Sequence, residues 1–454
     1  MKTAKRLSSR KMFLAIVLAV LCCLTVAVPA AAQQGDNVVW TSGTAKAPSS
    51  AFIDATAFCA TAGSCTTSDD FCAVVNKALN TLALSGGVID ARGINSGASN
   101  TCAKSPFISP NTINTPSTVL LPTGTITISK GWVLPNGTKI IGQGAGYPGY
   151  SATAIAAASA FATGGTMIQM GPNSTNSPLT ACSSATAGFC TEVSVEDLAL
   201  QGGSNGANVS GIINGQSQDM SYVRRVSMYQ IGGIGLKVWS NAQNSGPYSD
   251  ITYDNGGVGS SSTECAEIDV STRGLHGLFC KSESVTPSAA VIVDASNNSI
   301  KDVHILGTTT AGFTDGIQVK DTASSDVLFN VSGGTGVTNL IHLEKSGSTA
   351  AQDISIMSAA SGGSTNTIED SVTSTTLDDA YVGMYVLGVS GVGGSGYSRF
   401  TTSVTTSPNA VTWGVTSSST FPSACAKGSL LSYTSSSSGS LNVCTVSGTW
   451  KSLP

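Results

Sequence analysis

Glu196-Asp197-Leu198-Ala199-Leu200 is the first copy of a short motif in which two polar residues precede alternating apolar ones. The motif returns at Arg224–Met228, Ser249–Tyr253, Lys301–Ile305, Ser325–Phe329 and Gln352–Ile356. The central apolar residues lie 28, 25, 52, 24 and 27 positions apart, and the interval of 52 fits two steps of 26 with Leu278 in the gap. A fixed period of this length predicts a repeat architecture whose units stack on one another.

A second apolar run keeps step with this motif. In four repeats its centre falls 14 positions after the first, as Ile212 does after Leu198. Two strands per repeat with no helix between them exclude a βαβ sheet, and the signature of leucine-rich repeats is absent. The pattern predicts an all-β fold, a right-handed single-stranded parallel β-helix with alternate aliphatic residues pointing inward. The centres of the second run are Ile212, Leu236, Ile268, Ile292, Ile317, Ile341 and Ile368.

The regions on either side of the repeats are predicted to complete the fold. Residues Asp70–Leu79 have apolar side chains at helical spacing and Asp in the first turn, which predicts a helix that caps the first repeat. The repeat ends after Asp379. Residues 380–454 are rich in Gly, Ser and Thr and contain Cys425 and Cys444, so we expect a small disulfide-closed β module. A flexible tail pinned by one disulfide is the alternative.

Three motifs follow the capping helix in a distinctive order. The stretch Gly86-Gly87-Val88-Ile89-Asp90 precedes Leu121-Pro122-Thr123-Gly124-Thr125, and a strand-like segment that starts at Trp132 ends in Gly142-Gln143-Gly144. This succession resembles the opening of pectate-lyase-superfamily β-helices, in particular exported proteins of soil bacteria. The resemblance covers roughly residues 50 to 375 and implies the fold. It does not single out an activity, because that superfamily contains lyases, hydrolases, phage tail spikes and adhesins.

The first 32 residues are typical of a secretory signal peptide. Five positive charges within residues 1–11 precede an apolar run from Met12 to Val28, and small residues follow up to Ala32. Cleavage after Ala32 leaves residues 33–379 as the β-helix with its cap and 380–454 as the C-terminal module, with no membrane span. We therefore expect a secreted or cell-surface bacterial protein, with a membrane anchor as the alternative.

The mature chain is predicted to be acidic and disulfide-bonded. Removal of the leader leaves 17 basic and 26 acidic residues, a net charge of −9, which argues against nucleic acid and anionic membranes as partners. Ten cysteines remain, and an even number in an exported chain suggests disulfides. No CxxC motif occurs and the three histidines lack ligand spacing, so no metal site is expected. The predicted bridges are Cys182–Cys190, Cys265–Cys280 and Cys425–Cys444.

Thr314-Asp315-Gly316-Ile317 resembles the Asn-Thr-Asp-Gly-Ile of polygalacturonases, in which the Asp is catalytic. The paired Asp and the Gly-His-Gly that follow in that family do not appear in order. Asp315, Asn339 and Asn366 lie instead in register, each just before the second strand. Since Asp and Asn tolerate left-handed backbone and can stack in ladders, we interpret Asp315 as a turn residue.

The outward face of the second strand set is the predicted binding surface. Residues at odd offsets from each central aliphatic residue point outward, and stacking aligns them in one column. An aromatic face for a sugar ring, beside carboxylates and cations for its polar groups, suits a polysaccharide groove. Val291 and Val293, on either side of Ile292, interrupt the column. The candidate substrate-binding residues are Lys237, Trp239, Lys320, His342 and Glu344.

Glu267 and Asp269 form the predicted catalytic pair within this column. Alternate residues of a strand share a face roughly 6.6 Å apart. Inverting glycosidases separate their carboxyl groups by about 6.5–9.5 Å, and mutual repulsion raises the pKa of one acid, which suits a proton donor. The alternative is a solvated strand face with incidental charges.

Two functions fit these features. The first is a secreted carbohydrate-active enzyme, a hydrolase or lyase acting on an extracellular polysaccharide. A lyase needs a base such as Arg273 and acids, usually with Ca²⁺, to neutralise the substrate carboxylate. The second is a non-catalytic adhesin or glycan-binding protein, which the low charge and abundant Ser and Thr favour.

Overall fold

The computed structural model describes most of the region from residue 52 to 346 and shorter segments beyond it. The described ranges are 52–82, 86–107, 116–146, 152–172, 190–203, 209–258, 264–283, 286–294, 304–306, 309–320, 327–346, 349–350, 355–360, 366–370, 385–390, 413–416, 430–434, 439–446 and 449–453. The predicted signal peptide, residues 1–32, lies outside them.

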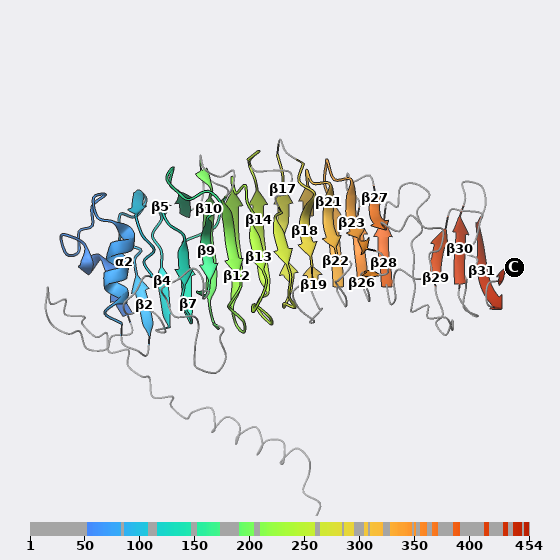
Figure 1. The fold of residues 1–454 in the computed structure, drawn as a ribbon, viewed down its shortest axis with the longest axis horizontal. Helices are drawn as coiled ribbons and strands as arrows, with labels where there is room; N and C mark the ends of the chain where they lie inside the picture. The colour runs from blue at the N-terminus through green and yellow to red at the C-terminus, as the bar shows by residue number, and fades with distance from the viewer. Residues whose placement is uncertain are drawn as a thin grey trace, which may run out of the picture. The chain divides into compact units, whose positions relative to one another are not determined.

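The fold is built mainly from two parallel sheets, and from Gly124 onward the chain passes alternately from one to the other (Figure 1). The 17-stranded sheet contains β1 (Phe52–Asp54), β2 (Gly87–Asp90), β3 (Ser99–Cys102), β4 (Ser117–Leu120), β5 (Gly124–Ile128), β7 (Thr138–Ile141), β8 (Thr153–Ala157), β10 (Ser194–Gln201), β12 (Tyr222–Tyr229), β14 (Tyr248–Asp254), β16 (Leu275–His276), β17 (Phe279–Lys281), β19 (His304–Leu306), β20 (Thr309–Ala311), β22 (Val327–Gly333), β26 (Ser355–Ala360) and β28 (Tyr385–Ser390). The nine-stranded sheet contains β6 (Trp132–Leu134), β9 (Thr166–Met170), β11 (Ser210–Asn214), β13 (Leu236–Val238), β15 (Ala266–Ile268), β18 (Ala289–Val293), β21 (Asp315–Val319), β23 (Asn339–Leu343) and β27 (Asn366–Asp370).

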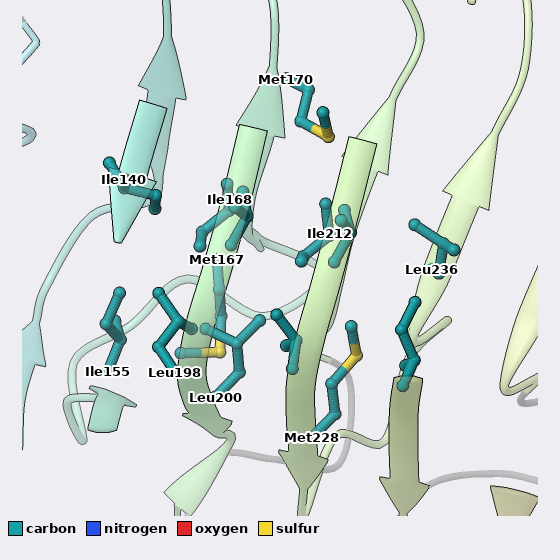
Figure 2. Packing of buried hydrophobic residues seen from close by; sticks show 14 of the residues in the cluster. Ile140, Ile155, Met167, Ile168, Met170, Leu198, Leu200, Ile212, Met228 and Leu236 are labelled. Carbon is teal, nitrogen blue, oxygen red and sulfur yellow. The ribbon is translucent and has the colours of Figure 1, made fainter. Parts of the chain in front are cut away.

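The core lies between the two sheets. Leu198 and Leu200 from β10 and Ile212 from β11 are fully buried, as the alternation of apolar residues predicts. Figure 2 shows these side chains filling the space between facing strands, with Met167 and Met228 beside them. Each repeat contributes a strand to both walls, so stacking extends one apolar column from repeat to repeat.

A left-handed backbone residue bends the strands of the 17-stranded sheet at one register position. Asp197, Arg225, Asp250 and Gly277 have φ values of 57°, 51°, 55° and 64° and stack in successive repeats. Strands β10, β12 and β14 run through the bend, whereas it divides β7 from β8 and β16 from β17. Left-handed backbone costs a non-glycine residue roughly 1–2 kcal/mol, which the surrounding hydrogen-bond ladder must offset.

The register of the nine-stranded sheet differs from the predicted one at Ile292. This residue pairs with Glu267 on one side and Gln318 on the other, and it lies half-buried on the outer face. Its neighbours Val291 and Val293 are the buried residues. The prediction that Ile292 points inward was therefore wrong, because the run Ala289–Val293 is apolar throughout and offers no alternation to fix the face.

The later copies of the first motif are also displaced. Val327 pairs with His304 and Ser355, whereas the repeat predicted Val303 and Ile354. The bend inserts extra residues into some repeats, and a prediction from one fixed period takes no account of them.

The predicted alignments of Leu198 with Val226 and of Val226 with Ile251 are confirmed. In the second run, Ile212 pairs with Leu236, Ile317 with Ile341 and Ile341 with Ile368, as predicted. Leu236 pairs with Ala266 and not with Ile268, so the predicted alignment of these two centres was wrong by two positions.

A short helical region precedes the sheets. The 3₁₀ helix η1 (Ala55–Phe58) and the α-helix α2 (Phe71–Leu79) contact each other, and α2 also contacts β2 and β3. The predicted helix is confirmed: Asp70 is its N-cap and accepts a hydrogen bond from the Ala73 amide at 2.8 Å. One face of α2 is buried against the first strands.

Disulfides join elements near the N-terminus and in the middle of the sheets. The predicted Cys265–Cys280 bridge is confirmed, and Cys59–Cys65 and Cys72–Cys102 are bonded as well. Cys190 and Cys444 are also disulfide-bonded, while Cys182 and Cys425 lie outside the described residues.

The C-terminal strands form a sheet of their own. Strand β29 (Trp413–Thr416) pairs in parallel with β30 (Leu430–Thr434), and β31 (Gly439–Val446) and β32 (Thr449–Ser452) follow in antiparallel order. A small hairpin, β24 (Lys345–Ser346) and β25 (Thr349–Ala350), lies between β23 and β26 in sequence. Strand β28 extends the 17-stranded sheet to Ser390, past the predicted boundary at residue 379. Among the described residues, no helix has the length and hydropathy required to span a bilayer.

Candidate functional site

The predicted site residues lie in two neighbouring rows on the outer face of the nine-stranded sheet. Across β13, β15, β18, β21 and β23, the first row contains Lys237, Glu267, Ile292, Gln318 and His342. The second row lies two positions further along each strand and contains Trp239, Asp269, Asp294, Lys320 and Glu344. The parallel register therefore brings together residues up to about 100 positions apart in sequence.

Lys237 links the two predicted catalytic acids. Its Nζ lies 2.8 Å from Glu267 Oε1 in the next repeat and 3.9 Å from Asp269 Oδ2. The Asp269 side chain is only 4% exposed, so the ammonium group offsets a buried negative charge. The same Nζ lies 5.6 Å from the centroid of the Trp239 ring, a cation–π contact. Trp239 remains 38% exposed, which leaves ring surface available to a ligand.

Glu264 is a site residue that the sequence analysis missed. It lies at the corner before β15, two residues ahead of Ala266, and is almost entirely buried. The pKa of its carboxyl group is raised to about 7, mainly by burial and in smaller part by the nearby Glu267 carboxylate. Its own backbone amide and the Lys237 and Lys320 ammonium groups act in the opposite direction. At neutral pH this carboxyl group is therefore partly protonated.

The sequence does contain a signal for Glu264. Asp315 occupies the same position relative to β21, two residues before Ile317, and the intervening repeat has Ala289 there. Both acids thus lie in one column at the start of these strands. Period-two patterning describes the strand itself, so it does not reach Glu264, which precedes β15.

Asp315 belongs to a second cluster. Its carboxylate accepts a hydrogen bond from Asn339 Nδ2 at 2.7 Å, and its Oδ2 lies 2.6 Å from His342 Nδ1. A carboxylate can only accept, so Nδ1 carries the shared proton. The predicted stacking with Asn339 is confirmed. However, Asp315 begins β21 rather than forming a left-handed turn, so that part of the interpretation was wrong.

Glu344 completes the second cluster. Lys320 Nζ lies 3.0 Å from Glu344 Oε1, and Gln318 Nε2 donates to the same oxygen. Both members of the ion pair are about one quarter exposed, with side-chain values of 26% and 27%. Ile292 lies between this cluster and Glu267, so one aliphatic side chain separates the two polar groups.

The donor arrangement does not fit Ca²⁺. No group of three or more His, Cys, Asp or Glu side chains in the described ranges is arranged to hold a metal ion. The Lys237 ammonium group already bridges Glu267 and Asp269, where a shared cation would have to bind. Calcium needs six to eight oxygen ligands, and an ammonium group among them would repel it.

The comparisons with known proteins describe distant likeness only. No protein-family model and no curated protein matches the sequence. Among solved structures, ORF18 of Geobacillus virus E2 superimposes with a TM-score of 0.38 at 10% identity, over 85% of this chain and 64% of the viral chain. The A-module of mannuronan C-5 epimerase AlgE6 from Azotobacter vinelandii superimposes with a TM-score of 0.33 at 14% identity, over 75% of this chain and 95% of that module. This chain thus spans less than two thirds of the viral protein, and function has to be inferred from its own side chains.

Proposed function

We propose that this chain is a secreted, right-handed parallel β-helix protein of the pectate-lyase type that hydrolyses an extracellular polysaccharide. Alternation of strands between two parallel sheets supports the β-helix, and parallel crossovers are right-handed in nearly all proteins. Disulfides support an oxidising compartment. The observation that carries the reaction is the raised pKa, about 7, of the Glu264 carboxyl group. This group lies near Glu267, which is ion-paired with Lys237.

Hydrolysis of a glycosidic bond needs a proton donor and a carboxylate that activates water. Glu264 is assigned as the general acid, because burial keeps it partly protonated at neutral pH. Glu267 is assigned as the base: it lies close enough to affect the Glu264 carboxyl group electrostatically. In this assignment Asp269 positions Lys237, and the exposed Trp239 ring stacks on a sugar.

The test is cleavage of a panel of neutral and acidic polysaccharides by the purified secreted chain, with and without a chelator. We expect new reducing ends, no dependence on the chelator and no ultraviolet absorbance from unsaturated products. Glu264→Gln and Glu267→Gln should each lower the rate about 10²–10⁴-fold, the range for loss of a general acid or base. The exposed Glu192 serves as a control, and Glu192→Gln should leave the rate unchanged.

A non-catalytic glycan-binding protein is the second candidate. The observation that favours it is the Lys237 bridge, which ties Glu267 into an ion pair. Under this alternative no polymer in the panel is cleaved, yet Trp239→Ala weakens binding of one of them. That result would overturn hydrolysis and retain the surface as a binding site.

A further inference from the structure

A hollow lies on the outer face of the 17-stranded sheet. It has a volume of about 520 Å³ and extends from segment 144–146 across strands β12 and β14. Its lining residues are Gly144, Ala145, Gly146, Asp197, Arg225, Val226, Ser227, Met228, Asp250, Thr252 and Asp254. None of them belongs to the hydrolytic site proposed on the nine-stranded sheet.

Hydrogen bonds hold one wall of this hollow in place. The Gly144 amide donates to the Asp197 carbonyl at 2.9 Å, and Ser227 Oγ donates to the Gly146 carbonyl at 2.6 Å. Segment 144–146 is therefore fixed against strands β10 and β12. A wall anchored in this way gives a preformed site rather than a gap between moving loops.

The charged groups of the hollow are arranged with one carboxylate open to a ligand. Arg225 is committed to Asp197 through two hydrogen bonds, at 2.5 and 2.6 Å. Asp250, one repeat further, is exposed and makes no side-chain hydrogen bond within the described part of the chain. The next repeat has Gly277 at this register, where a Cβ would lie 3.1 Å from Asp250 Oδ1. The absent side chain leaves that oxygen uncovered.

An exposed aromatic ring lies on the strand next to the hollow. Phe279 in β17 pairs with Thr252, a lining residue of β14, and is 41% exposed. A phenylalanine on an outer strand face gains nothing from water, whereas a flat ring beside hydrogen-bond acceptors matches the apolar face and hydroxyl edge of a sugar.

We propose that this hollow is a second glycan-binding site, separate from the hydrolytic surface, which takes an uncharged saccharide with one sugar ring stacked on Phe279 and its hydroxyl groups donating to Asp250. The charge balance sets the ligand class. Asp197 is paired with Arg225, and Asp254 with Lys281 at 3.5 Å, so the Asp250 carboxylate leaves the hollow with a net negative charge that disfavours a polyuronate. Such a site would bind the protein to a neutral polymer whether or not the surface on the nine-stranded sheet hydrolyses a polysaccharide.

The test is calorimetric titration of the full secreted chain carrying Glu264→Gln, which blocks the proposed cleavage, with cellohexaose, xylohexaose, maltohexaose and hexagalacturonate. We expect at least one neutral hexamer to bind and hexagalacturonate to bind at least tenfold more weakly. Phe279→Ala and Asp250→Asn should each weaken the neutral ligand at least tenfold, and Phe279→Trp should retain binding.

A matched control separates this site from the rest of the surface. Phe52→Ala removes an aromatic ring that is 51% exposed on β1 of the same sheet. This variant should bind the neutral hexamer like the parent. The proposal is overturned if no neutral hexamer binds, if Phe279→Ala binds normally, or if hexagalacturonate binds as tightly. These outcomes are independent of whether the wild-type chain hydrolyses any polymer.

Discussion

At the scale of single residues, burial of the Glu264 carboxyl group makes folding stability depend on pH. Its pKa is about 7 in the folded chain, against 4.5 for an exposed glutamate. The folded state therefore holds this proton more tightly than the unfolded state, and stability falls as pH rises from about 4.5 through 7. We expect Glu264→Gln to flatten this slope in urea unfolding at a series of pH values. Glu192→Gln should keep the wild-type slope, and equal slopes for all three proteins would contradict the assignment.

Lys237 provides a second test at this scale, because it compensates two acids of which one is buried. Lys237→Met removes this positive charge from beside the buried Asp269 carboxylate, and we expect the free energy of unfolding to fall by about 3 kcal/mol. Lys320→Met is the matched control, since its partner Glu344 is more exposed and can be hydrated, and should cost about 1 kcal/mol or less. Urea unfolding at pH 7 measures both, and equal losses would show that the bridge to Asp269 contributes little.

The rows of the candidate site could be predicted because they obey simple alternation. Lys237 and Glu267 share a register in consecutive strands, as stacking requires. Glu264 could not be found in this way, since it lies at a corner where the chain leaves one sheet for the other. Its raised pKa results from burial, and its burial depends on how the neighbouring repeats cover it.

At the scale of elements, the bend in the 17-stranded sheet explains a glycine in the Gly142-Gln143-Gly144 motif. Gly142 separates β7 from β8, and a Cβ there would lie 2.2 Å from the Asp197 carbonyl oxygen. We expect Gly142→Ala to lower the free energy of unfolding by more than about 2 kcal/mol, because backbone must move. Gly164→Ala, at a φ of 73° with no atom within 4 Å, should cost only about 1 kcal/mol. Chemical denaturation that ranks the two variants in the opposite order would contradict this account.

The same bend limits what periodicity could predict about the strands. The period and the two-strand repeat were recognisable because β10, β12 and β14 each begin with the same pattern. Beyond Gly277 the later copies slip against the earlier ones, and Val327 pairs with His304 rather than Val303. When the strands differ in length from repeat to repeat, the spacing between equivalent residues is not constant. Sequence spacing therefore predicts where the strands lie better than it predicts their register.

At the scale of the whole molecule, stacking leaves the first repeat without a preceding neighbour. Repeat proteins of this kind need a capping element, because an uncovered end exposes apolar surface and unpaired backbone groups. We infer that helix α2 is this element, because it contacts β2 and β3 and its Val75 side chain is fully buried. The Cys72–Cys102 bridge ties the helix covalently to β3. Cap and first strands should therefore unfold together.

This coupling gives a prediction for the intact protein. Val75→Asp places a charge against the buried face of α2, which should cost more than about 3 kcal/mol and release the cap. The exposed first strands should then pair between molecules, so we expect the mass measured by light scattering to exceed that of the wild type. Ala73→Asp adds the same charge on the exposed face of the first helical turn, where the helix dipole favours it, and should leave both properties unchanged. A Val75→Asp protein with wild-type mass and stability would show that the sheets do not depend on this helix.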